Sequence, residues 1–223
     1  SATELYANGA HLATEQYEIG DATLNKETAF GLDLQYAYKS ATWSGKISVF
    51  HTTFDDFIFS ENLGFQTDEL DTYRFTSVEA IFSGFEAELD YIAYQSGDTT
   101  LTIGLVADYV RATNEDNNND LPRIPPLRIS GTAQLDIMDW TASALLRHNY
   151  KQSDTAPNET DTDAFTELQL GLSRSFAGKD GEWTLFAIGR NLLDEDVRRH
   201  TSFLKDKAPQ PGRNLQFGAR YKF

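Results

Sequence analysis

The sequence predicts an all-β protein, an antiparallel transmembrane β-barrel to which this chain contributes about nine strands. Apolar and polar residues alternate with a period of two along most of the chain, which indicates strands. Many of these runs are as long as a strand that crosses a bilayer. Short turns and long polar loops also alternate between the runs, as is typical of such barrels.

The alternation is clearest at the end of the chain. One face of the last run is apolar or aromatic, and comprises Leu215, Phe217, Ala219, Tyr221 and Phe223. The other face carries Gln216, Gly218, Arg220 and Lys222. The run 127–137 repeats this pattern. In a membrane barrel the first face meets lipid and the second an aqueous interior.

We expect strands at nine such runs, over residues 29–39, 43–58, 73–94, 100–113, 126–137, 140–152, 163–176, 183–193 and 212–223. A tilted strand needs about 9–11 residues to cross a bilayer. Strands of water-soluble proteins typically have about 5–6 residues. The lengths therefore favour a membrane barrel over a soluble sandwich.

The connections between the runs alternate in length. We expect short turns near residues 40–41, 95–99, 138–139 and 177–182, and long polar loops at 60–72, 113–125, 152–162 and 193–212. If the long loops face outward, the last strand runs inward and ends at Phe223 on the inner side of the membrane. Tyr and Trp near the strand ends predict interfacial girdles, because their rings prefer headgroup depth.

An odd number of strands indicates that more of the barrel precedes Ser1. Bacterial single-chain barrels have even strand numbers, and a partial barrel leaves two sheet edges that lipid cannot satisfy. We therefore expect that this segment does not span a membrane alone.

Composition narrows the function. The net charge is −15, from 34 acidic and 19 basic residues, which excludes nucleic acid as a partner because a phosphate backbone requires a basic face. The chain has no cysteine, so it has neither disulfides nor thiolate metal ligands. It also lacks a Gly-rich phosphate loop and a Gly-x-Ser-x-Gly elbow, and we expect no enzymatic activity. Outer-membrane hydrolases also use barrels, so an enzyme remains a minor alternative.

Motifs at both ends are more specific. Asn191–Asp194 (NLLD), Pro211–Arg213 (PGR) and the terminal Phe223 resemble the last hairpin of TonB-dependent receptors. Ile19–Tyr36 is similar to the family segment that leads from an outer loop into a descending strand, although three usual residues are replaced there. Ser83–Glu88 (SGFEAE) is similar to the family's x-G-x-E-x-E strand.

This resemblance implies that residues 1–223 are a C-terminal segment of a larger plugged barrel in the outer membrane. The plug and the earlier strands would precede this sequence. Tyr221 and Phe223 would belong to the signal that the barrel-assembly machinery reads. The implied function is TonB-dependent import of a scarce nutrient, driven by the TonB–ExbB–ExbD complex through the N-terminal region, with no cofactor required.

The segment Glu4–Gly20 also resembles the zinc-uptake branch of these receptors, in which a histidine at the position of His11 is associated with zinc. Imidazole and carboxylate are ligands that suit zinc. We therefore expect His11 and His200 as candidate metal ligands. The nearby loop acids are further ligand candidates: Glu4, Glu15, Glu18, Asp194 and Asp196.

Zinc or another divalent metal ion is the preferred substrate at this stage. An iron–siderophore complex or haem is the alternative. Two other classes stay open: a passive porin-like or adhesin-like barrel without a plug, and a soluble β-protein that binds carbohydrate or protein partners. The sequence upstream of Ser1 separates the receptor from the porin, and folding in buffer without detergent would indicate the soluble protein.

Overall fold

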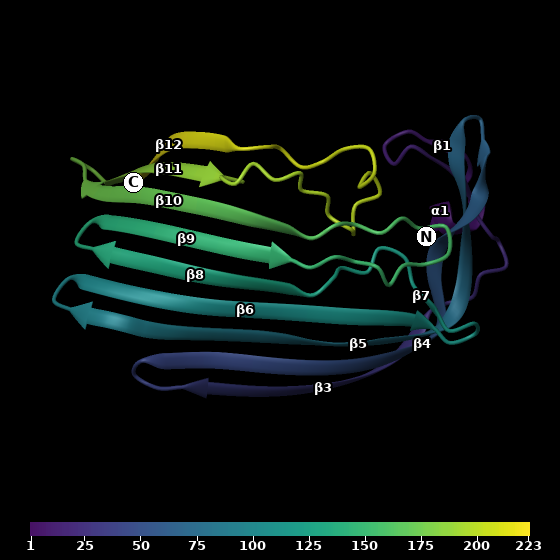
Figure 1. Ribbon diagram of the computed structural model, residues 1–223, viewed down its shortest axis with the longest axis horizontal. Helices are drawn as coiled ribbons and strands as arrows, with labels where there is room; N and C mark the ends of the chain where they lie inside the picture. The colour runs from purple at the N-terminus through teal and green to yellow at the C-terminus, as the bar shows by residue number, and fades with distance from the viewer.

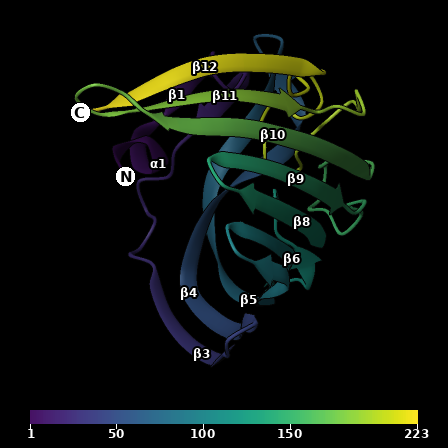
Figure 2. The same cartoon turned by 90° about the vertical axis from the view of Figure 1, so that its left-hand side faces the viewer.

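The computed structural model describes all residues from Ser1 to Phe223 and shows one open, curved sheet (Figure 2). Nine long strands follow one another in antiparallel pairs, with the sheet edges at β3 and β12. The long strands are β3 (Thr28–Lys39), β4 (Trp43–Thr67), β5 (Leu70–Ser96), β6 (Thr99–Asn114), β8 (Arg128–Ile137), β9 (Trp140–Asn149), β10 (Phe165–Ala177), β11 (Glu182–Arg190) and β12 (Asn214–Lys222). The predicted fold class and the nine long strands are confirmed.

Turns and loops separate to opposite ends of the sheet (Figure 1). The short connections, residues 40–42, 97–98, 138–139 and 178–181, lie at the end where the C-terminus also lies. The long connections gather at the other end, which we call the loop end. This arrangement agrees with the prediction that the long loops share one end of the sheet and that the last strand ends at the other.

One face of the sheet is apolar and open. Large hydrophobic side chains that a water-soluble protein would bury are exposed, among them Phe217 at 76% and Leu34 at 71%. Leu215 and Leu170 are also exposed, and Leu127 and Ile129 are only half-buried, so none of these four lies inside a closed core. Such a face requires an apolar surrounding, which the hydrocarbon of a membrane supplies.

The opposite face carries polar and small residues. Gly84 of β5 lies on this face, and neighbouring atoms pack directly against its Cα. A Cβ at Gly84 would lie 2.3 Å from the carbonyl oxygen of Tyr109 and 2.6 Å from the Phe50 ring. The position therefore excludes a side chain, and the Phe50 ring takes the space.

Aromatic side chains form a girdle on the apolar face at the short-turn end. Trp43 stacks on Tyr91 with ring centroids 4.2 Å apart, and Trp183 lies against Tyr221 at 4.8 Å. Phe223 follows Tyr221 on the same face at 6.4 Å. The predicted girdle is present at this end, where amphipathic rings suit the headgroup depth.

The loop predicted at residues 60–72 is wrong, because β4 and β5 continue through it as one hairpin. Tyr73 pairs with Asn62 and Leu70 with Thr67, and the chain reverses at Asp68 and Glu69. Both turn residues have positive φ, 52° and 64°, as a two-residue hairpin turn of type I′ requires. The polar composition suggested a loop, whereas the backbone ladder continues there irrespective of polarity.

The N-terminal part adds elements that the sequence did not predict. Helix α1 (Ala2–Tyr6) precedes a small hairpin of β1 (Asn8–His11) and β2 (Gln16–Ile19). Strand β2 then pairs in parallel with residues 71–74 of β5, the only parallel pairing in the sheet. No helix of the structure has the length and apolar character to span a membrane.

The hydrophobic core is small and lies at the loop end. Leu121, which follows the two-residue strand β7 (Asn119–Asp120), packs on Ala80 of β5 and Ala112 of β6. Phe54, Phe57 and Phe82 surround this contact, and the Phe54 ring lies edge-on to each of the other two at 5.2 Å. This core ties the β6–β8 loop to the wall.

The two faces predict opposite tolerance to charge. In the complete receptor in lipid vesicles, Leu170→Arg on the apolar face should lower the free energy of unfolding by about 2–4 kcal/mol, because a cation would enter hydrocarbon. The neighbouring Gln169→Arg, on the polar face, should have little effect. Equal losses in denaturant titrations of the two variants would contradict the assignment of the faces.

Candidate functional site

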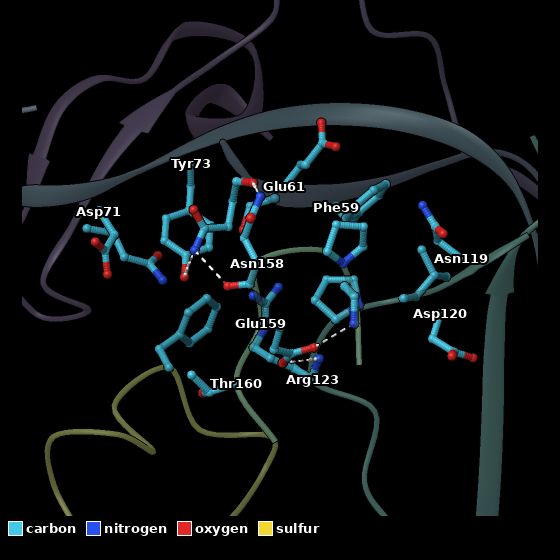
Figure 3. A pocket seen from close by; sticks show the side chains of 18 of the residues that line it. Phe59, Glu61, Asp71, Tyr73, Asn119, Asp120, Arg123, Asn158, Glu159 and Thr160 are labelled. Atoms are coloured by element: carbon cyan, nitrogen blue, oxygen red, sulfur yellow. Dashed lines mark hydrogen bonds between the residues drawn. The ribbon is translucent and has the colours of Figure 1, made fainter. Parts of the chain in front are cut away.

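A cleft opens among the long loops at the loop end of the sheet (Figure 3). Its volume is about 840 Å³ when the open solvent at its mouth is included. Five segments supply its walls: the start of β2 at Gln16, the outer part of the β4–β5 hairpin and the β6–β8, β9–β10 and β11–β12 loops. The lining combines amide groups and the rings of Phe59, Tyr73 and Phe203 with five carboxylates, those of Glu61, Asp71, Asp120, Glu159 and Asp206.

The β4–β5 hairpin is held over the cleft by two amide side chains. Asn62 donates from Nδ2 to the carbonyl oxygen of Asn158 at 3.3 Å, and Asn158 donates from Nδ2 to the carbonyl oxygen of Asn62 at 3.1 Å. Gly64, with φ of +74°, lets the hairpin pass against the Asn158 side chain. This reciprocal pair links residues 96 positions apart and fixes the position of the β4–β5 hairpin above the cleft.

Glu159 connects three loops through its carboxylate. Its Oε1 accepts from the backbone N–H of Arg123 at 3.0 Å, and its Oε2 from that of Ala156 at 3.2 Å. Nε2 of His200 lies 3.3 Å from Oε1. Burial acts to raise the pKa of Glu159, but the contacts with His200 and the backbone outweigh it and hold the pKa below the ordinary value.

Arg123 and Tyr73 border the cleft from opposite sides (Figure 3). The Arg123 guanidinium lies over the Phe203 ring, 4.2 Å from its centroid, a cation–π contact between two loops. Burial lowers the pKa of Arg123 and raises the pKa of Tyr73. At these two positions the cleft therefore offers a partly desolvated guanidinium and a neutral phenol to a bound molecule.

Lys205 ties the last long loop to the β9–β10 loop. Its buried Nζ donates to the carbonyl and hydroxyl oxygens of Thr160. The Thr160 hydroxyl in turn donates to Oδ1 of Asp206 at 2.8 Å. The cleft walls are thus connected by hydrogen bonds on every side, which favours a preformed site.

The predicted ligand His11 lies at the end of β1, outside the cleft. Its Nδ1 meets Oε1 of Glu18 at 2.7 Å, and its side chain is half exposed. Glu18 is one of the acids that the sequence singled out. The structure therefore brings together one imidazole and one carboxylate on the β1–β2 hairpin.

His200, the second predicted ligand, lies beneath the loops with a side chain only 1% exposed. Its Nδ1 is 3.1 Å from the Thr162 hydroxyl, and its Nε2 faces Glu159. His11 and His200 thus have separate neighbours. No group of three or more His, Asp or Glu side chains is arranged to hold a metal ion.

The remaining candidate acids each have a local partner. Glu4 belongs to the capping box of α1, and Glu15 pairs with Lys207 at 2.7 Å. Asp194 accepts from the backbone N–H of Arg213 at 2.8 Å, and Asp196 pairs with Arg198 at 3.0 Å. The Glu15–Lys207 contact joins the N-terminal hairpin to the last long loop.

Sequence reasoning missed most of the cleft. Residues 113–125 were expected only as a long polar loop, yet Asn117 and Asn119 of this loop line the cleft. Glu159 and Arg123 were not singled out, because a lone acid or base in a loop carries no pattern. The density of Asn in this loop was the one available signal.

Comparison with known proteins identifies the class of barrel. The family described as "TonB dependent receptor-like, beta-barrel" matches residues 1–192. This chain belongs to that family, a family of outer-membrane receptors and not of enzymes.

Solved structures agree on the fold. The "Copper transporter OprC" superposes with a TM-score of 0.78 at 21% identity, over 91% of this chain and 33% of that one. The ferric enterobactin receptor PfeA (G324V mutant) of Pseudomonas aeruginosa gives 0.66 at 16%, over 92% and 32%. The FrpB iron transporter of Neisseria meningitidis gives 0.65 at 16%, over 93% and 33%. This chain thus spans about a third of the length of each.

Removing the Glu159 carboxylate should loosen three loops at once. Glu159→Ala in the complete receptor should speed hydrogen exchange in residues 114–127, 150–164 and 191–213 by roughly tenfold or more, because hydrogen bonds to a charged group are lost. Asp161→Ala, which removes only an exposed ion pair with Lys151, is the matched control. Unchanged exchange in the first variant would contradict the linking role.

The lowered pKa of Glu159 also sets a pH dependence. A depressed pKa means that the stabilisation is complete above the ordinary glutamate value of about 4.3 and is lost as pH falls below it through the folded pKa. A spin label at Ser153→Cys should therefore become mobile below about pH 4. In Glu159→Gln, the label should show no such transition, and the same profile in both proteins would refute this assignment.

Proposed function

We propose that this chain forms a C-terminal part of the wall of a receptor that imports a scarce nutrient through the outer membrane. The sheet with one lipid-facing and one polar face carries this proposal, together with membership of the TonB-dependent receptor family. In this proposal the loops of this segment form part of the roof above the lumen. The TonB–ExbB–ExbD complex drives transport through the N-terminal region, which lies outside this sequence.

The proposed substrate is zinc or another divalent metal ion. His11 and Glu18 support it, since they place an imidazole nitrogen and a carboxylate oxygen 2.7 Å apart on the β1–β2 hairpin, where His11 is half exposed and Glu18 is largely buried. Zinc accepts both ligand types and usually takes four ligands. Further ligands would have to come from elsewhere in the receptor or from water.

A chelated metal is the second candidate, and the cleft is the observation that favours it. Its amide groups, the rings of Phe59, Tyr73 and Phe203 and the Arg123 guanidinium offer contacts to an organic chelator that a bare ion would not use. Two of the similar structures carry names that refer to ferric enterobactin or iron. In this case His11 would play no part in recognition.

A titration of the complete receptor with zinc separates these candidates. We expect saturable zinc binding by calorimetry that His11→Ala weakens by roughly tenfold or more, because loss of an outer-shell group alone costs that much. His51→Gln, a histidine bound to Ser83 on the apolar face, should leave the affinity unchanged. Absence of zinc binding to the wild type, or equal zinc affinity of His11→Ala and the wild type, would rule out the metal-ion hypothesis.

Uptake by whole cells tests the transport mechanism itself. Accumulation of labelled zinc should depend on both this receptor and TonB. Uptake that persists without TonB would indicate a passive porin-like channel instead.

A further inference from the structure

A second cavity lies beneath the same loops, on the polar face of the sheet. Its volume is about 640 Å³ when open solvent at its mouth is included, and it lies between the outer ends of β8 and β9 and the β11–β12 loop. Asp108, Arg128 and Asn149 reach it from the strands, and Arg198, Arg199 and His200 from the loop. Neither His11 nor the β4–β5 hairpin lines this cavity.

The charge of this cavity is opposite to that of the chain. Its lining contains three guanidinium groups and one carboxylate, in a protein of net charge −15. The carboxylate, Asp108, is occupied by Arg128, whose Nε donates to it at 2.8 Å. Arg199 has only a long contact of 3.8 Å with Glu167, which leaves most of its donors free. The cavity thus repels cations and attracts anions.

A buried polar atom without a partner lies at the same place. Asn149 Nδ2, in the cavity lining, has neither a hydrogen-bond nor an ion-pair partner in the molecule. Three further buried atoms make no regular hydrogen bond, but each has a charged neighbour: His200 Nε2 lies 3.3 Å from Glu159, and Arg147 forms an ion pair with Glu167 at 3.8 Å. A buried amide N–H without a protein partner indicates a bound polar species.

We propose that this cavity binds a free oxyanion of the phosphate class. The Arg199 guanidinium and the Asn149 amide donate to its oxygens, and Arg128 adds a nearby positive charge. Planar guanidinium donors match oxyanions in geometry and charge. A lipid headgroup does not reach the site, because the cavity opens on the face opposite to the lipid-facing one.

The bound anion has a structural consequence. His200, next to this cavity, contacts Glu159, which holds the β6–β8 and β9–β10 loops. An anion at Arg199 and Asn149 therefore joins the last long loop to the strands beneath it. This role is separate from the proposed transport and does not depend on the nutrient.

Thermal unfolding of the complete receptor in detergent, with a chelator present, tests the proposal. Inorganic phosphate should raise the Tm saturably above that in chloride of equal ionic strength. Arg199→Gln should weaken the apparent phosphate affinity by roughly tenfold or more, since a charge-assisted contact is lost. Arg213→Gln, an arginine in the same loop with a 3.8 Å contact to Asp194, is the matched control and should respond like the wild type.

Asn149→Asp provides a second test with almost no change of shape. The carboxylate would repel the anion, so the phosphate-dependent rise in Tm should disappear in a protein that still folds. The proposal is overturned if phosphate and chloride act alike on the wild type, which would mean that only water occupies the cavity. It is also overturned if the Arg199 and Asn149 variants respond to phosphate as the Arg213 variant does.

Discussion

The pairing of backbone hydrogen bonds in hydrocarbon is the constraint on which this structure depends. Lipid offers no partner to an N–H or C=O group, so each must be paired within the sheet. The molecule has 132 backbone hydrogen bonds, of which 109 lie within its strands and helix. The continuous ladder from β3 to β12 fixes the strand order, and the membrane then selects which side chains alternate on each face.

Outside the membrane a different balance holds the loops. Eleven buried residues are polar or charged and only five are hydrophobic, so most of the buried residues do not belong to a hydrophobic core. Glu159, Lys205 and the Asn62–Asn158 pair join segments far apart in the sequence. Apolar anchors are fewer: Leu121 packs on Ala80 and Ala112, and Val197 of the last long loop is fully buried. Polar contacts thus position the long loops and the outer β4–β5 hairpin, and the Leu121 contact attaches the β6–β8 loop to the sheet.

The sequence predicted the wall well and the roof poorly, for a physical reason. Period-two alternation is local, so Leu215 to Phe223 reveal both a strand and its lipid face without knowledge of any neighbour. Glu159 gains its role only from Arg123 and His200, which the chain brings near from 36 and 41 positions away. The Asp68–Glu69 turn was missed because Glu is an uncommon choice for positive φ. The pairing of β2 with β5 likewise has no local signal.

The extended β4–β5 hairpin has a consequence for how such a protein can diversify. Its outer part is positioned by backbone ladder pairing and by the side-chain amides of Asn62 and Asn158, which donate to main-chain carbonyls. The ladder bonds are indifferent to most side-chain exchanges, whereas the two Asn side chains must be kept. A residue such as Glu61, which lines the cleft, is therefore free to change over evolutionary time while the hairpin keeps its position over the cleft. In this hairpin the backbone pairing determines the structure, and the side chains that line the cleft determine specificity.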